Sequence, residues 1–409
     1  LAGERRFEEA LNLHRERNPF ASVCAYICAH PCENRCQRAA VDAPVSIREV
    51  ARYMVSAEKE TNRPSGQPNP DNAERKVAVI GAGPAGLTAA YFLARLGYRP
   101  VVFEASSQPG GMLTQTIPAF RLPREAVNRE IDMIRSLGVT IETNKPLGKD
   151  ITLNTLRENG YEGVIISCGS SISKKLHIPG ENAEGVTDAG TYLSLYNRTG
   201  TAPTGAKVVV IGGNNAAFDA ARAAKRLGAA EVTVLYRRTR REMTAYEECI
   251  DDAEREGVTI TSLAGPVAVK TVEGRLSGIT CVRMELGAFD LSGRPAPVPV
   301  ENGQFDLDAD QIIIAIGRDS NTEFSWGEPG LETDVSGFIR VNSQTQQSGI
   351  PWIFACGEAA QGGESVIDAI ASGERAAVEL DRFLTGASHA FWRAQKLVDT
   401  AFDMTAEPL

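Results

Sequence analysis

Two stretches of the chain repeat one pattern of apolar and polar positions. The first begins at Lys76 and reads KVAVIGAGPAGLTAAYFLARLGYRPVVFE, and the second begins at Lys207 and reads KVVVIGGNNAAFDAARAAKRLGAAEVTVLYRR. In each, an apolar run of strand length leads into a glycine-containing turn, an alanine-rich helix and a second strand rich in β-branched residues. This order predicts two βαβ units with parallel sheets, and therefore an α/β fold with two Rossmann-type dinucleotide sites.

Shorter patterns extend this plan on both sides. Apolar residues recur at helical spacing between Val45 and Lys59, which predicts a helix there. Residues 61–74 are rich in Pro, Asn and Ser and predict a linker. Towards the C-terminus, Gln311–Ile316 and Trp352–Cys356 are expected to be buried strands, and a helix is expected from Ser365 to Leu380.

Composition narrows the possible class of protein. The chain has 409 residues and a net charge of -9, which argues against a general nucleic-acid surface. We find no uncharged apolar stretch long enough to span a membrane and no secretory signal after Leu1, and the absence of a starting Met suggests missing upstream residues. Four of the eight cysteines are bunched and the others are isolated, which fits a reducing cytoplasm better than a disulfide framework.

The first glycine turn has the features of a dinucleotide site. Gly81 allows a tight turn after the strand, Gly83 leaves room for a pyrophosphate, and Gly86 lets the helix approach the strand. The phosphates would then lie at the positive end of the helix. Glu104 closes the next strand at the distance expected for an acid that binds ribose hydroxyls.

Two further segments fit a bulky cofactor beside this turn. Gly110 and Gly111 follow the ribose acid and let the chain pass close to such a group. Ala355–Glu358 ends a strand shortly before the helix that starts at Ser365. A helix N-terminus beside a flavin would stabilise negative charge on the reduced ring.

These motifs resemble one flavoprotein family. It includes the glutamate synthase small subunit, the FAD/NADPH half of dihydropyrimidine dehydrogenase and the large subunit of NADH-dependent ferredoxin:NADP oxidoreductase. The shared motifs are NPF at Asn18, the cysteine run, GAGPAG, GGMLTQTIPAFRLP, YRRTRREM and Gly357-Glu358, across roughly residues 18–385. The resemblance implies an FAD site made of Gly81, Gly83, Pro84, Ala85, Gly86, Glu104, Gly111, Met112, Leu113, Arg121, Leu147, Gly357, Glu358 and Val366. Glu358 stands where the family usually has Asp, and its longer arm can still reach a ribityl hydroxyl.

The second glycine turn departs from the standard pattern. Gly213, Asn214 and Asn215 follow Gly212, so Asn214 stands where a glycine is usual. Asn tolerates left-handed backbone angles best among non-glycine residues, but its side chain could crowd a pyrophosphate. The site is thus either adapted or weakened.

An arginine cluster takes the place of the second ribose acid. Tyr236 aligns with Glu104, and the arginines that follow suit a 2′-phosphate, although they could also be a solvated basic stretch. In the resembling family, members that use NADP(H) carry Arg at the positions of Arg237 and Arg238, and Gly317 would lie near the nicotinamide. We favour NADP(H), with NAD(H) left open.

A thiol–disulfide enzyme is disfavoured because the chain contains no C-x-x-C motif. The histidines also lie in unrelated contexts, so no Ser/His/Asp set is indicated. Hydride transfer between two cofactors depends on proximity more than on an acid or base. We therefore assign no catalytic side chain.

The cysteine run Cys24, Cys28, Cys32 and Cys36 has C-x3-C spacing throughout. On one straight helix it would extend over about 18 Å, too far for one cluster, but Pro31 interrupts that helix. Four thiolates suit a 4Fe–4S cluster or zinc. By the resemblance two clusters would be held, but the earlier cysteine motif is missing and Ala51 replaces the Glu or Gln ligand. One 4Fe–4S cluster completed by Cys24 is the favoured reading. A site shared with a partner, zinc and free thiols remain alternatives.

These inferences give a domain plan. It begins with a helical cysteine-rich domain at 1–60 and a linker at 61–74. An FAD-binding domain follows in two parts, at 75–190 and 313–386, with an NAD(P)-binding domain inserted between them at 191–312. The chain ends in a tail at 387–409.

The favoured function follows from this plan. The chain would exchange hydride between NAD(P)(H) and FAD, and pass electrons to or from iron–sulfur clusters of a larger complex. The resemblance leaves glutamate synthase, transhydrogenase and aldehyde oxidoreductase types open, with iron–sulfur and catalytic subunits as partners. The alternatives are a stand-alone NAD(P)H reductase of a small acceptor and a flavin-binding structural subunit whose nicotinamide site has decayed.

Overall fold

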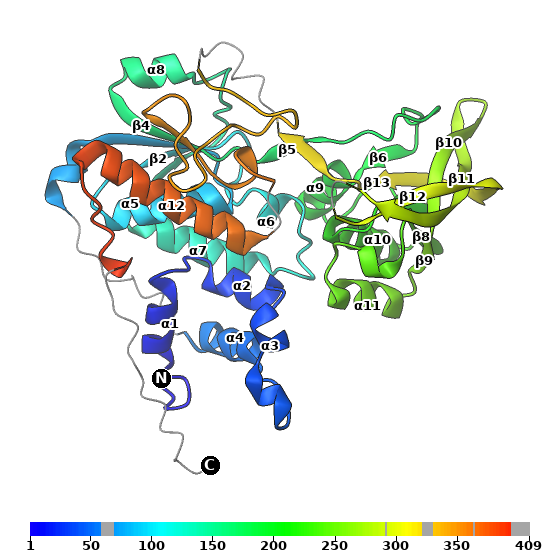
Figure 1. The fold of residues 1–409 in the computed structure, drawn as a ribbon, viewed down its shortest axis with the longest axis horizontal. Helices are drawn as coiled ribbons and strands as arrows, with labels where there is room; N and C mark the ends of the chain where they lie inside the picture. Colours follow the sequence, from blue (N-terminus) through cyan, green and yellow to red (C-terminus); the bar gives the residue numbers. More distant parts are fainter. Residues whose placement is uncertain (59–68, 291–292, 321–329, 363–364, 394–409) are drawn as a thin grey trace.

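The first apolar repeat forms the centre of a five-stranded parallel sheet in the computed structural model (Figure 1). The structure describes residues 1–58, 69–290, 293–320, 330–362 and 365–393. The strand order is β15-β4-β1-β2-β3, with β1 at Lys76–Ile80, β2 at Val101–Phe103, β3 at Thr140–Glu142, β4 at Tyr161–Ile166 and β15 at Ile353–Ala355. The central strands are buried on both faces, as expected for a parallel sheet covered by helices.

Helices cover this sheet, and α5 packs against α12 along much of its length. Gly373 permits that approach, because a Cβ there would press on the Ala85 carbonyl oxygen. The expected helix from Ser365 to Leu380 is confirmed as α12, with Ser365 as its N-cap and a longer C-terminal end. The helices of this part are α5 (Pro84–Arg95), α6 (Met112–Gln115), α7 (Arg124–Ser136), α8 (Leu153–Glu158), η5 (Gly357–Ala359) and α12 (Val366–Thr385).

The second repeat builds another five-stranded parallel sheet. Its order is β6-β13-β7-β8-β9, with β6 at Val186–Asp188, β7 at Lys207–Ile211, β8 at Glu231–Tyr236, β9 at Thr259–Ser262 and β13 at Gln311–Ile314. Its helices are α9 (Ala189–Thr199), α10 (Asn215–Arg226), η3 (Arg240–Glu242) and α11 (Glu247–Arg255). An antiparallel three-stranded sheet extends from it, made of β10 (Ala264–Val272), β11 (Arg275–Phe289) and β12 (Pro295–Asp308).

The second sheet is inserted into the first part of the fold. The chain passes between the two through β5 (Ser170–Ser173) and returns through β14 (Arg318–Ser320), which pair as an antiparallel ribbon. We call residues 186–314 the nucleotide domain, and residues 76–173 with 318–385 the host domain. The strands of the second sheet begin at residue 186 and end at residue 314, whereas the sequence predicted an NAD(P)-binding domain at 191–312.

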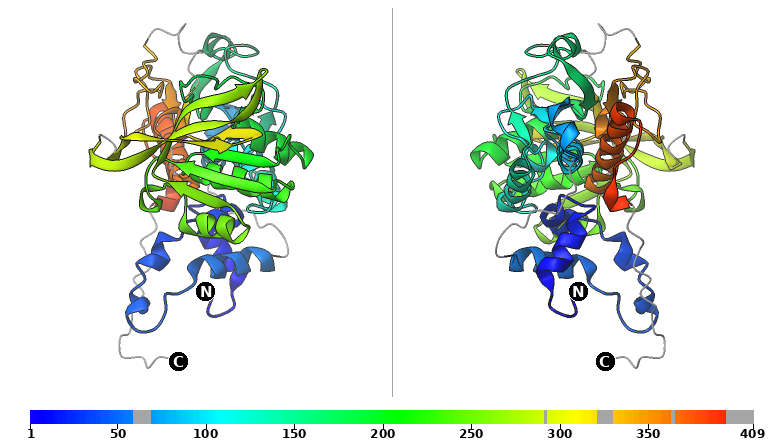
Figure 2. Two further views of the ribbon diagram at one scale, coloured as in Figure 1. Left: turned by 90° about the vertical axis from the view of Figure 1, so that its right-hand side faces the viewer. Right: turned by 90° about the vertical axis from the view of Figure 1, so that its left-hand side faces the viewer.

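The N-terminal residues form a small helical layer against the host domain (Figure 2). We call residues 1–58 the cysteine domain. Its helices are α1 (Phe7–Arg15), α2 (Ala21–Ile27), α3 (Pro31–Asn34), η1 (Gln37–Ala40) and α4 (Ile47–Ala57). Phe20, Val23 and Ile27 belong to the same buried cluster as the host-domain core, so α2 is packed onto that domain.

The two remaining segments are described only in part. Of the expected linker, Pro70–Glu74 forms the 3-10 helix η2, and residues 61–68 lie outside the described residues. Of the expected tail, Phe391–Arg393 forms η6 and places Trp392 against Phe92 in the host-domain core, whereas 394–409 lie outside the described residues. Among the described residues, no helix is both long and apolar enough to cross a membrane.

Candidate functional site between two dinucleotide turns

The first glycine turn accepts only glycine at two positions. Gly81 has φ +102°, and a Cβ there would lie 2.5 Å from the Ser167 carbonyl oxygen. A Cβ at Gly86 would collide with the Gly81 carbonyl oxygen and with Ser167 Oγ. The turn is therefore packed directly on the end of β4, as the sequence pattern predicts for close helix–strand contact.

Open space lies in front of this turn at the start of α5. A Cβ at Gly83 would meet nothing within 4 Å, and no side chain caps the helix N-terminus, where Pro84 occupies the first turn. The first backbone N–H groups of a helix lack intrahelical partners and lie at its positive end. This arrangement suits a phosphate group.

Glu104 is fixed beside the same turn. Its carboxylate accepts hydrogen bonds from Ala82 N at 2.7 Å and from Ser106 N at 2.8 Å, and the residue is only 7% exposed. The acid therefore lies at the turn, where a dinucleotide ribose would be placed.

The other residues of the expected FAD set fall into two groups. A Cβ at Gly111 would lie 2.8 Å from Gly83 Cα, and one at Gly357 would lie 2.7 Å from Ala85 Cβ, so both glycines border the turn. Met112 and Leu113 begin α6, and Val366 begins α12. Leu147 instead forms a bridge with Ile151 and packs against the buried cluster that contains Ala78, Ile80 and Val164 of the central strands.

The second turn is capped by its unusual asparagine. The sequence suggested a left-handed backbone at Asn214, but its φ is -101°, in the extended region. Its Oδ1 accepts from Ala217 N at 3.0 Å, and its Nδ2 donates to the Ala315 carbonyl at 3.0 Å. Asn215 Oδ1 accepts from Tyr246 N at 2.9 Å. Both side chains are thus held by backbone groups and shape the turn.

The arginines after β8 are not equivalent. Arg238 is buried and donates to Asp290 at 2.5 Å and to the Pro295 carbonyl at 2.7 Å. Arg240 forms ion pairs with acids of α11. Arg237 and Arg241 are exposed, and among the described residues neither forms an ion pair. Two guanidinium groups therefore remain open to a ligand.

A cavity of about 310 Å³ lies beside the second turn, where the host and nucleotide domains meet. The host domain contributes Met112, Thr116 and Glu358, and the nucleotide domain contributes Asn214 and Ala216, with Gly317 and Arg318 at the crossing between them. Burial raises the pKa of the Glu358 carboxyl. The cavity brings residues of both expected sites to one place.

Sequence reasoning did not identify Arg318. Its Nη1 lies 3.3 Å from Met112 Sδ and 3.5 Å from the Ser170 carbonyl oxygen. The available signal was its position just beyond the carboxyl end of β13, where open α/β sheets place ligands.

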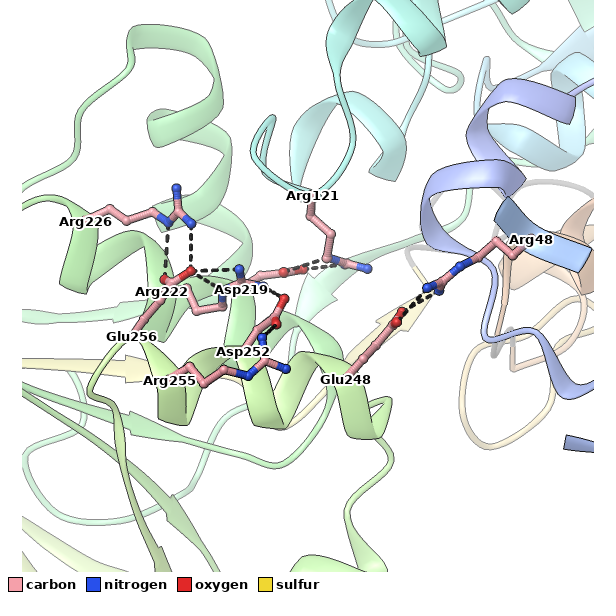
Figure 3. A network of polar contacts seen from close by, with 9 residues as sticks. All are labelled: Arg48, Arg121, Asp219, Arg222, Arg226, Glu248, Asp252, Arg255 and Glu256. Atoms are coloured by element: carbon pink, nitrogen blue, oxygen red, sulfur yellow. Dashed lines mark hydrogen bonds and ion pairs between the residues drawn. The ribbon is translucent and has the colours of Figure 1, made fainter. Parts of the chain in front are cut away.

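Ion pairs connect the domains (Figure 3). Arg121 of the host domain forms a two-pronged contact with Asp219 of α10, at 2.8 Å and 2.5 Å. Burial raises the pKa of the Asp219 carboxyl, and the charge and hydrogen bonds of Arg121 act in the opposite direction. Arg121, expected at the FAD, thus has a protein partner. Arg48 of the cysteine domain pairs with Glu248 of α11 at 2.7 Å and 2.9 Å.

The cysteine run is interrupted where the sequence predicted. Cys24 lies in α2, Cys28 follows that helix, and Cys32 lies in α3, after a turn at His30 with φ +39°. Cys36 precedes η1. Within the described ranges, no three His, Cys, Asp or Glu side chains are arranged to hold a metal ion.

The sulfur environments nevertheless differ in a way that bears on ligation. Backbone N–H groups of Val45 and Arg38 lower the pKa of Cys36, and Cys28 Sγ accepts from His30 N at 3.4 Å. Such N–H···S contacts stabilise thiolates of the kind that hold iron–sulfur clusters. Burial raises the pKa of Cys24 to about 12. Cys28 and Cys36 therefore fit a cluster well, whereas Cys24 faces the host-domain core.

Comparison with known protein families matches both parts of the chain. Residues 75–373 match the pyridine nucleotide-disulphide oxidoreductase family. Residues 1–63 match the family described as dihydropyrimidine dehydrogenase domain II, 4Fe-4S cluster. These matches imply FAD and NAD(P)(H) for the two large domains and a 4Fe–4S cluster for the N-terminal one, and they confirm the predicted cofactors.

Several curated relatives resemble nearly the whole chain. The beta subunit of NADP(+)-dependent formate dehydrogenase from Moorella thermoacetica is 39% identical over 93% of this chain, and the NADPH-Fe(3+) oxidoreductase subunit beta of Geobacter sulfurreducens is 36% identical over 93%. The chain spans 57% and 60% of these two relatives. The glutamate synthase [NADPH] small chain of Azospirillum brasilense is 30% identical, with 92% of this chain and 81% of the relative covered.

Solved structures share the fold. FprA of Mycobacterium tuberculosis in complex with NADPH aligns with a TM-score of 0.65 at 19% identity, over 76% of this chain and 85% of FprA. Lactococcus lactis thioredoxin reductase aligns with a TM-score of 0.58 at 23% identity, over 77% of this chain and 100% of that one. The predicted α/β fold with two dinucleotide domains is confirmed. The chain belongs to the pyridine nucleotide-disulphide oxidoreductase family and carries a 4Fe–4S domain of the dihydropyrimidine dehydrogenase type on its N-terminal side.

Proposed function

We propose that this chain is the NADP(H)–FAD subunit of a larger redox complex, in which hydride passes between the nucleotide and FAD and electrons pass to or from iron–sulfur clusters. The observation that carries the proposal is the cavity of about 310 Å³ between the host and nucleotide domains. Hydride transfer requires two carriers to meet in a shielded space, and this cavity is lined from both domains.

The host domain would hold FAD. The space in front of Gly83 and the free N–H groups of α5 would take the pyrophosphate, and Glu104 the ribose. Gly111, Met112, Leu113, Gly357, Glu358 and Val366 would follow the rest of the cofactor. When bound, FAD supplies a carrier that accepts a hydride and releases electrons singly.

The nucleotide domain would hold NADP(H), with Gly213, Asn214 and Asn215 at the pyrophosphate. Arg237 and Arg241 are exposed, so their guanidinium groups can reach a 2′-phosphate. Arg238, just after β8, would stabilise the end of that strand through its hydrogen bond to Asp290. Gly317 and Arg318 would border the nicotinamide, since both line the cavity.

The cysteine domain would hold the 4Fe–4S cluster. Cys28, Cys32 and Cys36 come after α2, where the chain is no longer one continuous helix, so the three thiols can approach one another. Cys24 is the proposed fourth ligand. The buried Cys24 thiol must lose its proton to serve, so its mutation should reveal whether another group completes the site.

The partners would be iron–sulfur and catalytic subunits in the cytoplasm. Support comes from the names of the relatives, which are subunits of formate dehydrogenase, of an NADPH-Fe(3+) oxidoreductase and of glutamate synthase. All eight cysteines are free in the structure, which fits a reducing compartment.

Anaerobic titration of the flavin-loaded chain with NADPH, and separately with NADH, tests this function. NADPH should bleach the flavin at lower concentration, and Arg237→Gln with Arg241→Gln should weaken NADPH binding by about 2 to 3 kcal/mol without affecting NADH. Arg135→Gln is a matched surface control, since Arg135 is exposed on α7. A flavin that neither nucleotide bleaches would support the decayed-site alternative.

A further inference from the structure

A short segment of the host domain reaches onto the nucleotide domain. We call residues 115–121 the docking segment; it begins at the last residue of α6. Asn197 of α9 donates from Nδ2 to the Gln115 carbonyl at 2.9 Å and to the Ile117 carbonyl at 3.2 Å. One amide side chain of the nucleotide domain thus satisfies two backbone groups of the segment.

Phe120 is the apolar contact of the docking segment. Its ring packs against the buried core of the nucleotide domain and forms an edge contact with Tyr196, with ring centroids 6.4 Å apart. The guanidinium groups of Arg222 and Arg226 on α10 lie 4.9 Å and 4.2 Å from its centroid. Such cation–π contacts favour one orientation of the ring on α10.

Arg121 forms the charged contact. Its Nε and Nη2 donate to the two carboxylate oxygens of Asp219 at 2.8 Å and 2.5 Å, and the two side chains are 13% and 3% exposed. A bidentate guanidinium–carboxylate pair fixes direction as well as distance. Asp219 lies four residues beyond Asn215, the first residue of α10, so the anchor is about 6 Å along the helix from the nucleotide turn.

The other end of the segment is fixed to the host domain. Arg124 donates to the Leu113 carbonyl at 2.5 Å and to the Ile117 carbonyl at 2.7 Å. Met112 and Thr116, at the start of this stretch, line the cavity between the two domains. One stretch of about ten residues therefore borders the cavity at one end and grips the helix of the nucleotide turn at the other.

We propose that Arg121 and Asp219, with Phe120, are positioning residues that set the distance between the nucleotide turn and the flavin site. The proposal rests on the proposed function, and it assigns Arg121 to domain docking in place of flavin contact. The chain crosses between the two domains at the β5–β14 ribbon. Among the described residues, Arg121–Asp219 is the one buried ion pair that joins α10 to the host domain.

The variants must separate docking from simple loss of folding. Removing only one charge leaves its partner buried and unpaired, which destabilises the protein for reasons unrelated to docking. The double variant R121Q/D219N keeps the side-chain sizes and removes both charges, and Arg121→Lys keeps the charge but loses the two-pronged geometry. Arg75→Gln is the control, because Arg75, just before β1, pairs with Glu162 of the host domain at 2.9 Å.

Two measurements on the flavin-loaded chain test the proposal. The first is the rate of flavin reduction at saturating NADPH, measured anaerobically by stopped flow together with the dissociation constant for NADPH. R121Q/D219N should reduce the rate about 10- to 100-fold with little change in the dissociation constant, and Arg121→Lys should fall between. The second is amide hydrogen exchange without nucleotide, which should accelerate in residues 115–121 and at the start of α10.

The control and the contrary outcomes are distinct. Arg75→Gln should match the wild-type chain in both measurements. Wild-type exchange across residues 115–121 in R121Q/D219N would overturn the docking role, whatever the flavin does. If NADPH fails to reduce even the wild-type flavin, the proposed function fails and the exchange result alone decides the docking proposal. A lower flavin content with unchanged exchange would return Arg121 to the flavin site.

Discussion

Two glycines of the first turn, Gly83 and Gly86, have different structural roles. A Cβ at Gly86 would collide with backbone and side chain inside the protein, whereas a Cβ at Gly83 would point into open space. The sequence pattern GAGPAG does not distinguish these positions, but the structure does. One glycine is needed for folding, and the other leaves room for a ligand.

Substitution of these two glycines should therefore give opposite results. Gly86→Ala should destabilise the protein by about 3 kcal/mol, because the Gly81 carbonyl cannot move away without disrupting the turn. Gly83→Ala should leave unfolding unchanged and weaken FAD binding by about 2 kcal/mol. Chemical denaturation of the flavin-free protein and FAD titration measure the two effects. An unfolding midpoint lowered by Gly83→Ala would contradict the assignment.

Among the elements, helix α7 ties the cysteine domain to the host domain. Glu130 of α7 accepts from Ser22 N at 2.7 Å and lies 3.4 Å from Arg15 Nη2, and both Arg15 and Glu130 are fully buried. Arg15 also pairs with Glu58 at the end of the domain. Because α1 and α2 are held to one carboxylate, the start of the cysteine run has a fixed place on the host domain.

Glu130→Gln tests this tie. The amide keeps the size of the side chain but loses the charge facing Arg15, so we expect a loss of about 1 to 3 kcal/mol in unfolding free energy. Iron content of the reconstituted protein should fall with it, because α2 carries Cys24. Glu125→Gln, on the same helix near its start, is the control. Unchanged stability and iron content in Glu130→Gln would mean that α2 is held by its apolar face alone.

At the scale of the whole molecule, Glu248 of the nucleotide domain faces two basic side chains of the cysteine domain, Arg48 and, at 3.8 Å, His30. Arg48 binds Glu248 of α11 and also donates to the Cys28 carbonyl at 3.0 Å. Burial alone would raise the pKa of Glu248, but the hydrogen bond and charge of Arg48 outweigh it, so the pKa is lowered. The pair is partly exposed, with Glu248 40% exposed, and its contribution should be small.

The contribution of this pair should depend on pH and salt. Because the folded-state pKa of Glu248 lies below its unfolded value, the stabilisation is complete above the unfolded pKa of about 4.5 and disappears as the pH falls through the folded value. Wild-type minus Glu248→Gln stability should be under about 1 kcal/mol at neutral pH and vanish in acid and in 1 M salt. Thermal unfolding at several pH values checks this, and a difference that grows in acid would contradict it.

The sequence predicted local patterns better than contacts between domains. The two βαβ repeats, the helix at α12 and the break in the cysteine run follow from periodicity, glycine and proline, which act within a few residues. Arg121 and Asp219 are far apart in sequence, and nothing near either one identifies its partner. The same holds for Arg238, whose charge suggested a phosphate ligand although the chain buries it against Asp290. Ion pairing over long sequence separation is a tertiary property that local pattern does not encode.

Because β5 and β14 pair with each other, the nucleotide domain is an insertion whose two ends lie side by side. Ser173 and Arg318 lie directly opposite each other in the β5–β14 ribbon, so the chain leaves and re-enters the host domain at the same place. Excision of everything between them brings together ends that are already neighbours, and a tight turn suffices to close the gap. Evolution can therefore exchange this module for one of different coenzyme preference without rethreading the host sheet.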